Sequence, residues 1–172
     1  DVYKRQLVET LGIGCHCVDR AATGEGEKVL VIGAGPIGLA VIEFLKVAKA
    51  EITVMDMNET RLAFCKDRLG GDHTVVFKGD DTEVERLKEV NGGELPTTVI
   101  DATGSHVSMS NAFQYAAFTG QVVYVGITTQ ELTFKHVTIH RPELTVKASR
   151  NAVPSDFTRI IKLIEDGVID TT

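Results

Sequence analysis

A glycine-rich turn directly after a short apolar run constrains the fold of this chain more than any other feature. Residues 29–32 are all aliphatic, and the residues that follow them read Gly33-Ala34-Gly35-Pro36-Ile37-Gly38. Gly33 permits a tight turn from a strand into a helix, and Gly35 leaves the backbone N–H groups open to an anion. Gly38 allows the new helix to pack closely on the strand. The pattern predicts a strand, a turn and a helix whose N-terminus attracts an anion, although close packing alone also accounts for such glycines.

Short β-branched runs alternate with amphipathic stretches along the rest of the chain, as is typical of parallel strands joined by helices. The predicted strands are 28–32, 51–55, 73–77, 97–101, 121–125 and 144–148. The predicted helices are 8–22, 37–47, 59–69, 82–90, 107–117, 133–141 and 155–166. The sequence therefore predicts an α/β fold of the Rossmann type, a doubly wound six-stranded parallel sheet with helices on both faces.

The length and charge of the chain bound the kind of protein it can be. Its 172 residues suffice for one buried core and are too few for two substantial domains. A net charge of −6 disfavours nucleic acid or an anionic membrane as a partner, because both require a basic face. The longest uncharged apolar stretch, 29–42, is shorter than the ~20 residues of a transmembrane helix. The three cysteines form no paired disulfide framework, so we expect the protein in the cytoplasm.

An acidic residue after the second predicted strand agrees with the glycine turn. Asp56 lies 18 residues after Gly38, close to the spacing at which a carboxylate meets the adenosine ribose of a dinucleotide. A carboxylate there accepts hydrogen bonds from the ribose diol and repels a 2′-phosphate, so the pattern predicts NAD(H) over NADP(H). Asp56 would also serve as the N-cap of the next helix, and both uses could coexist. Arg61 has two possible roles. It would lie at the adenine or the ribose, in which case NADP(H) binding is not excluded, or it would pair with Glu59 or Asp67 on its own helix.

The chain resembles the medium-chain, zinc-containing alcohol dehydrogenases, particularly the sorbitol dehydrogenase-like and threonine dehydrogenase-like members. The resemblance is carried by residues 9–16, 29–39, 56–62 and 122–126. In that family a separate catalytic domain holds a zinc ion, which acts as a Lewis acid on the substrate oxygen. The resemblance implies that 7–26 is a lead-in helix from a catalytic domain missing from this chain, and that 27–172 is an NAD-binding Rossmann domain truncated at its C-terminus. Residues 1–6 resemble a translated sequencing adapter, and we expect them to be an artefact.

The resemblance also implies which residues bind the cofactor, because ligands of such sheets lie beyond the carboxyl ends of the strands. Pro36 and Ile37 join the three glycines in the turn expected at the diphosphate. Residues expected to flank the adenosine are Ala102, Thr103 and Gly104, those at the nicotinamide ribose are Val125, Gly126 and Ile127, and those at the nicotinamide or the substrate are Ser149 and Arg150. Arg150 departs slightly from the spacing of the sorbitol dehydrogenases.

Candidate metal-binding residues lie near the start of the chain. Glu9 matches the position at which sorbitol dehydrogenase-like proteins place a glutamate beside the zinc, so the resemblance makes it a candidate catalytic and metal-binding residue. A glutamate that complements the dipole at a helix N-terminus is the alternative. Cys15, His16 and Cys17 point in different directions on a helix, so we expect them to pack in the core rather than to share one cation.

These observations lead to one functional expectation and two alternatives. We expect an intact parent enzyme that transfers hydride between NAD(H) and a small-molecule secondary alcohol, a polyol or a sugar acid, with zinc in its missing catalytic domain, and an inactive isolated fragment. We also expect a homo-oligomer formed by edge pairing of residues 121–127. A non-catalytic NAD-sensing module would share the fold and the glycine turn but would lack the 9–16 segment. A methyltransferase also places glycines after its first strand, but the helix opening at Pro36 favours a diphosphate.

Overall fold

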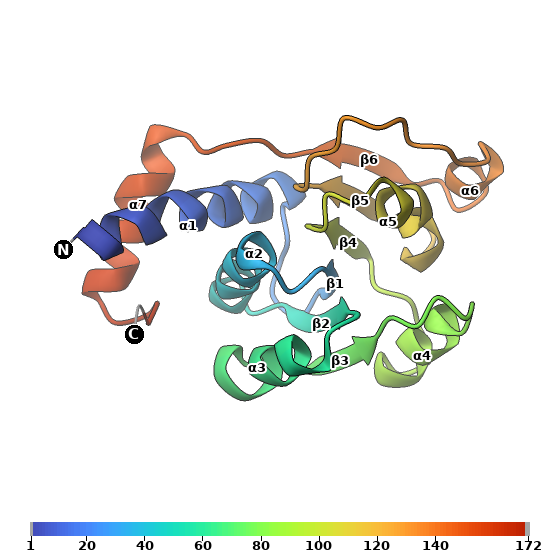
Figure 1. Cartoon of the computed structure of the whole chain (residues 1–172), viewed down its shortest axis with the longest axis horizontal. Helices are drawn as coiled ribbons and strands as arrows, with labels where there is room; N and C mark the ends of the chain where they lie inside the picture. Colours follow the sequence, from blue (N-terminus) through green and yellow to red (C-terminus); the bar gives the residue numbers. More distant parts are fainter. Residues whose placement is uncertain (1, 171–172) are drawn as a thin grey trace.

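The fold is organised by a single parallel sheet. The structure, a computed structural model, describes residues 2–170, and for residues 2–6 it describes the backbone alone. Within these residues six parallel strands lie in the order β3-β2-β1-β4-β5-β6 (Figure 1). The strands are β1 Lys28–Ile32, β2 Glu51–Asp56, β3 His73–Val76, β4 Thr98–Asp101, β5 Gln121–Tyr124 and β6 Thr145–Ala148. The sheet begins at the central strand β1, continues outward to β3, returns to β4 and continues outward to β6, which confirms the predicted doubly wound sheet.

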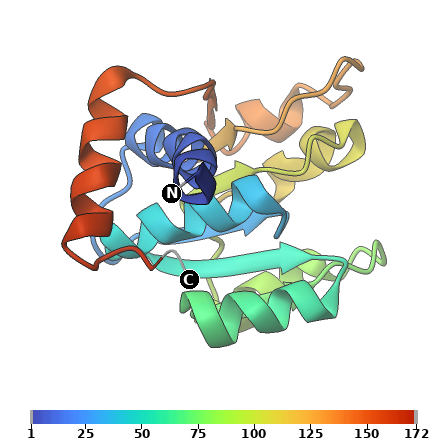
Figure 2. The same ribbon diagram turned by 60° about the vertical axis from the view of Figure 1, so that its left-hand side comes forward.

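Helices cover both faces of the sheet (Figures 1 and 2). They are α1 Val2–Ala21, α2 Pro36–Val47, α3 Glu59–Leu69, α4 Glu83–Val90, α5 His106–Asn111, the 3-10 helix η1 Ala112–Tyr115, α6 Val137–His140 and α7 Pro154–Glu165. Val29 and Val31 of β1 pack in the hydrophobic cluster that includes residues of α1, α2 and α7, whereas Leu30 and Ile32 pack in the cluster that includes α4, α5 and η1. Because successive side chains of a strand point to opposite faces, this one strand supports both layers.

The first helix is docked on the second through a close backbone contact. A Cβ atom added at Gly14 would lie 2.5 Å from the carbonyl carbon of Ala40, so a larger residue would separate α1 from α2. Helix α7 packs beside α1 (Figure 2). Between them, Arg159 donates a hydrogen bond of 2.9 Å to Asp19. Within residues 2–170, no helix combines the length and the apolar character needed to cross a membrane.

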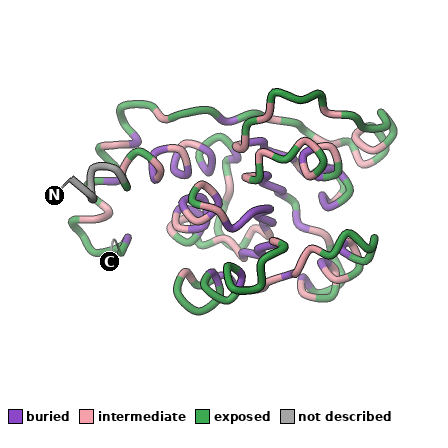
Figure 3. The backbone as a smooth tube through the Cα atoms, in the orientation of Figure 1, coloured by how far each residue is buried: buried purple, intermediate pink, exposed green. Residues whose placement is uncertain are grey.

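Two predicted helices differ from those observed. The predicted helix 107–117 divides into α5 and the tighter turn η1, and 3-10 turns are common at the ends of α-helices. The predicted helix 133–141 shortens to α6, none of whose four residues is buried. Most helical stability in proteins comes from packing an apolar face, and within α6 only Ile139 packs, partly buried, against a core cluster. Figure 3 shows the chain between β5 and β6 as mainly exposed.

The predicted edge position of residues 121–127 is wrong. Strand β5 pairs on both sides, with Val122 opposite Val99 of β4 and opposite Val146 of β6. The edges of the sheet are β3 and β6. Strand β6 is short, and three of its four residues are exposed, a pattern typical of an edge strand rather than a central one.

Candidate cofactor-binding site

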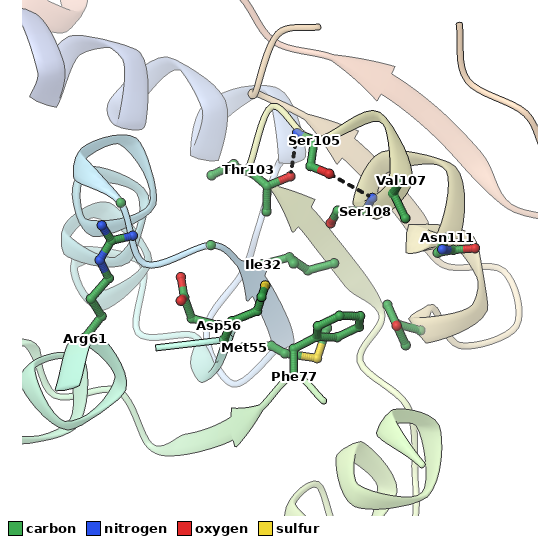
Figure 4. Close-up of a pocket in the computed structure, with 15 residues that line it drawn as sticks. Ile32, Met55, Asp56, Arg61, Phe77, Thr103, Ser105, Val107, Ser108 and Asn111 are labelled. Atoms are coloured by element: carbon green, nitrogen blue, oxygen red, sulfur yellow. Dashed lines mark hydrogen bonds between the residues drawn. The ribbon is translucent and has the colours of Figure 1, made fainter. Parts of the chain in front are cut away.

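A pocket of about 430 Å³ lies at the carboxyl ends of the central strands. It is lined by Ile32, Gly33, Gly35, Met55, Asp56, Met57, Arg61, Phe77, Ala102, Thr103, Ser105, Val107, Ser108, Asn111 and Tyr115. Figure 4 shows Asp56 and Arg61 on one side of the pocket, Ser108 and Asn111 on the other, and Phe77 between them. Strand order reverses between β1 and β4, and open α/β sheets bind ligands at such a switch point.

The three glycines of the turn occupy different surroundings. Gly33 has a φ of +98°, which side chains rarely adopt, and its N–H donates to Met55 O at 2.8 Å. A Cβ atom at Gly38 would overlap the main-chain oxygen of Gly33, so Gly38 permits the start of α2 to lie against the turn. A Cβ atom at Gly35 would meet no atom within 4 Å. Gly35 therefore faces open space beside the pocket.

Helix α2 begins at Pro36 without a side-chain cap. Its N-cap residue is Gly35, and no side chain accepts a hydrogen bond from the first turn, which also holds Ile37. The first N–H groups of a helix have no intrahelical acceptors, and together they carry roughly half a positive charge. This end of the helix can therefore accept an anionic ligand.

Asp56 is held by two backbone N–H groups. Its Oδ2 accepts a hydrogen bond from Ala34 N at 2.7 Å, and its Oδ1 accepts one from Asn58 N at 2.8 Å. The N-cap of α3 is Asn58, whose side chain accepts from Arg61 N at 3.1 Å, so the interpretation of Asp56 as the N-cap is wrong. The carboxylate is thus oriented at the wall of the pocket by the glycine turn and by the start of the next helix.

Arg61 contributes the positive charge on this side of the pocket. It is exposed on the first turn of α3 and lines the pocket beside Asp56. In the described part of the chain, neither Glu59 nor Asp67 forms an ion pair with it. The predicted pairing of Arg61 with Glu59 or Asp67 is therefore not observed, and its side chain lies at the rim of the pocket.

The loop after β4 forms the opposite wall. Ala102 and Thr103, two of the residues that the resemblance implied at the adenosine, line the pocket, and Gly104 has a φ of +66° that favours glycine. Asp101, which the sequence did not single out, accepts hydrogen bonds from Thr103 N, Thr103 Oγ1 and Ser108 Oγ at 2.9, 2.7 and 2.6 Å. Burial raises the pKa of the Asp101 carboxyl, and the bonds from Ser108 and Thr103 oppose that rise only in part. The available signal was an acidic residue at the end of a predicted buried strand.

The residues expected at the nicotinamide lie on the same edge of the sheet but outside the pocket lining. Val125 N and Gly126 N donate to Asp101 O, and Ile127 is 85% exposed. Ser149 is buried at the end of β6, where its N–H donates to Tyr124 O at 2.8 Å, and Arg150 is exposed. The structure therefore shows a pocket at the β2–β1–β4 side and places the residues after β5 and β6 at the same edge of the sheet, outside that pocket.

Several apolar pocket residues were not predicted. Met55 and Met57 come from the end of β2 and the residue after it, Phe77 follows β3, and Val107 and Tyr115 come from α5 and η1. They form walls suited to a flat ring, because aromatic and aliphatic side chains line most small-molecule pockets. Their contributions come from segments far apart in the sequence, which leaves no local pattern to recognise.

Comparison with known protein families identifies the family of the chain. Residues 36–166 match the family described as zinc-binding dehydrogenase. The chain belongs to this family. The L-galactonate-5-dehydrogenase of Escherichia coli K12 is 37% identical over 163 residues, which are 95% of this chain and 47% of that protein. The L-arabinitol 4-dehydrogenase of Aureobasidium melanogenum is 32% identical over 168 residues, 95% of this chain and 45% of that protein.

Solved structures agree with the fold. A short chain alcohol dehydrogenase from Escherichia coli CFT073, solved with the cofactor NADH, superposes with a TM-score of 0.84 and 26% identity, covering 95% of this chain and 48% of that one. The chain spans about half the length of the curated relatives it matches.

The name of the family implies a zinc ion. One cluster of side chains in this chain has the chemistry of metal ligands, but it does not fit zinc. Ligand atoms of Cys15, Asp19 and Asp156 lie within 4.8 Å of one another, the one such group within the described residues. Arg159 already places its guanidinium there, 2.9 Å from Asp19 and 3.8 Å from Cys15 Sγ. The guanidinium of Arg159 thus supplies a positive charge where a cation would have to lie, and burial, which raises the pKa of Cys15 to about 11, adds to the cost of the thiolate that zinc binds.

The other early residues do not complete a metal site. Cys17 is fully buried in the core, as expected, and His16 lies 3.4 Å from Asp156. Glu9 is exposed on α1, and it lies in the interior of that helix, so its interpretation as a residue of the helix N-terminus is wrong. It lines neither the pocket nor the cysteine cluster.

Proposed function

We propose that this chain binds NAD(H) and serves as the cofactor-binding half of a zinc-dependent dehydrogenase acting on a secondary alcohol of a polyol or sugar acid. One observation carries the proposal: the open face of Gly35, the uncapped start of α2 and the oriented carboxylate of Asp56 meet at one pocket. The sugar-acid and polyol relatives and the NADH-bound neighbour support the cofactor and substrate class. The division into a lead-in helix at 7–26 and a cofactor domain at 27–172 is part of this proposal.

The residues of the pocket fit the adenosine half of NAD. Adenine would lie between the apolar walls, and the ribose diol would donate to the remaining lone pairs of Asp56, since each carboxylate oxygen accepts more than one hydrogen bond. The diphosphate would lie against Gly35, Pro36 and Ile37 at the start of α2. Asp56 disfavours a 2′-phosphate through charge repulsion, while Arg61 opposes that effect.

The reactive half of the cofactor would lie beside the residues that follow β5 and β6. Bound NAD supplies a hydride acceptor, and Val125, Gly126 and Ile127 would orient its ribose from the end of β5. Ser149 and Arg150 would lie near the nicotinamide or the alcohol, and Glu9 remains a proposed contact to zinc or substrate. The high exposure of Ile127 supports a surface that is completed by residues outside this chain.

Two further properties belong to the proposal. Strand β6 offers an unpaired edge with Val146 46% exposed, which supports a homo-oligomer through this edge in place of residues 121–127. All three cysteines are free and buried, which supports a reducing, cytoplasmic location.

Titration with NADH tests the cofactor assignment. NADH fluorescence is expected to rise and saturate with the unchanged chain. Asp56→Ala is expected to weaken NADH binding by about 10–100-fold, because a bond to a charged group contributes roughly 1.5–3 kcal/mol. It is also expected to reduce the preference for NADH over NADPH.

A second carboxylate provides the matched control. Asp72 accepts a backbone hydrogen bond from Ile52 N at 2.7 Å, the same length as the Asp56 bond to Ala34, but it lies near the amino end of β2. Asp72→Ala is expected to leave NADH affinity unchanged. If Asp56→Ala also leaves NADH affinity and cofactor preference unchanged, or if S-adenosylmethionine binds in place of NADH, the proposal is wrong.

A further inference from the structure

A carboxylate that does not reach the pocket organises one wall of it. Asp101 ends β4 and is 0% exposed. Its Oδ1 accepts from Thr103 N and Thr103 Oγ1, and its Oδ2 accepts from Ser108 Oγ. A buried carboxylate is costly unless it is hydrogen-bonded, so these contacts determine how the loop after β4 can fold.

The groups that Asp101 holds do line the pocket. Thr103, Ser105 and Ser108 are pocket residues, whereas Asp101 is not. Thr103 Oγ1 donates to Asp101 and also accepts from Ser105 N at 3.0 Å. Ser105 in turn is the N-cap of α5 and accepts from Ser108 N. The carboxylate thus orders a continuous hydrogen-bonded path along this wall, two bonds of which are drawn in Figure 4.

The main chain of Asp101 holds the neighbouring loop as well. Its carbonyl oxygen accepts from Val125 N at 3.1 Å and from Gly126 N at 3.0 Å. A Cβ atom at Gly126 would lie 2.5 Å from Gly104 N, so the loops after β4 and β5 are in direct backbone contact. A change in the β4 loop must therefore also move the β5 loop.

We propose that Asp101 is a positioning residue for the dinucleotide, which fixes the loops at its adenosine and nicotinamide sides without touching it. The inference rests on the proposed function, because it concerns the same site. Residues that hold a binding loop in its bound conformation raise affinity by reducing the cost of ordering that loop.

Two substitutions at Asp101 separate positioning from simple burial. Asp101→Asn keeps an acceptor for Thr103, and its amide can donate to Ser108 Oγ, because a hydroxyl both donates and accepts. Asp101→Ala removes every side-chain contact. We expect the Asn variant to bind NADH within about threefold of the unchanged chain and the Ala variant to bind at least about tenfold more weakly.

A matched buried acid and a double variant complete the test. Asp156 is 4% exposed and accepts from Val153 N at 2.8 Å, at the start of α7. Asp156→Ala is expected to lower the melting temperature while affinity for ADP-ribose, measured by calorimetry, stays unchanged. As a single substitution, Thr103→Val is expected to weaken ADP-ribose binding. Combined with Asp101→Ala it is expected to cause no further loss of affinity, since the effects of two residues that act through one contact are not additive.

The outcomes distinguish this inference from the proposed function. If the unchanged chain fails to bind NADH, the proposed function fails and the positioning role fails with it. If the unchanged chain binds NADH and a folded Asp101→Ala binds equally well, or if Thr103→Val and Asp101→Ala add fully, the positioning role alone is overturned. Should Asp101→Ala fail to unfold cooperatively, Asp101→Ser, which keeps one oxygen, takes its place with the same expected loss and the same criterion.

Discussion

Two glycines of one turn are expected to respond in opposite ways to the same added methyl group. At Gly35 a Cβ atom meets nothing within 4 Å and φ is −81°, so alanine fits the backbone and the surroundings of the free chain. At Gly38 a Cβ atom overlaps the main-chain oxygen of Gly33, which cannot rotate away as a side chain could. Gly38→Ala should therefore perturb folding, and Gly35→Ala should perturb binding.

The magnitudes follow from these contacts. Overpacking costs about 1–3 kcal/mol, and an overlap with main-chain atoms belongs to the upper part of that range, about 2–3 kcal/mol. Alanine recovers about 1 kcal/mol over glycine inside a helix, so we expect Gly38→Ala to lose about 1–2 kcal/mol. At roughly 2–4 °C per kcal/mol for a domain of this size, the melting temperature should fall by about 2–8 °C. Gly35→Ala should leave the melting temperature unchanged or slightly raised, because alanine restricts the unfolded chain. Its methyl group occupies the space proposed for the diphosphate, so NADH affinity should fall by about tenfold or more.

Differential scanning fluorimetry and NADH titration of both variants provide the assay. The decisive result is the crossed pattern, with stability lost at Gly38 and affinity lost at Gly35. A Gly35→Ala chain that binds NADH as tightly as the unchanged chain would refute the placement of the diphosphate. An unchanged melting temperature for Gly38→Ala would refute the account of helix packing against the turn.

Further predictions concern titration and thiol reactivity. Burial raises the pKa of Glu83, but the N–H groups of Lys78, Glu83 and Gly79 and the charge of Arg86 outweigh it, so the pKa is lowered overall. The ionised carboxylate therefore stabilises the fold above its unfolded pKa near 4.5, and this stabilisation is lost as the pH falls. Glu83→Gln should lower the free energy of unfolding by about 1–2 kcal/mol at pH 7 and leave it unchanged well below pH 4, as measured by urea unfolding. Burial raises the pKa of Cys15 and Cys65 to about 11 and that of Cys17 to about 12, so a thiol reagent at pH 8 should label these cysteines slowly in the native chain and fast in denaturant, whereas fast native labelling would contradict their burial.

The topology could be predicted because its signals are local. The apolar runs, the intervening amphipathic stretches and the glycine turn each report on neighbouring residues, and right-handed crossovers leave few ways to assemble them. Which strand forms the edge of the sheet was harder to predict. Residues 121–127 and 144–148 both read as strands, and only the observed pairing shows that the second, more exposed one is terminal.

The sequence singled out the residues on one side of the candidate pocket and missed several on the other side. Asp56 and the glycines follow a spacing that recurs in dinucleotide-binding folds, so the sequence was sufficient. The N-cap alternative for Asp56 was wrong because Asn58, two residues later, takes that position. Asp101, Phe77 and Tyr115 reach the site through the order of strands and the path of loops, which no short-range pattern encodes.

The central strand explains why two acidic residues near it serve the site differently. Strand β1 carries the glycine turn, and its neighbours β2 and β4 end in Asp56 and Asp101. Asp56 is half-buried, faces the pocket and binds the turn through Ala34 N, so its free lone pairs remain available to a ligand. Asp101 is fully buried, and its carboxylate oxygens accept hydrogen bonds from residues of the opposite wall. Because both carboxylates lie at the ends of strands that pair with β1, a ligand placed between the two walls meets polar groups that the sheet and the hydrogen bonds of Asp101 hold in place.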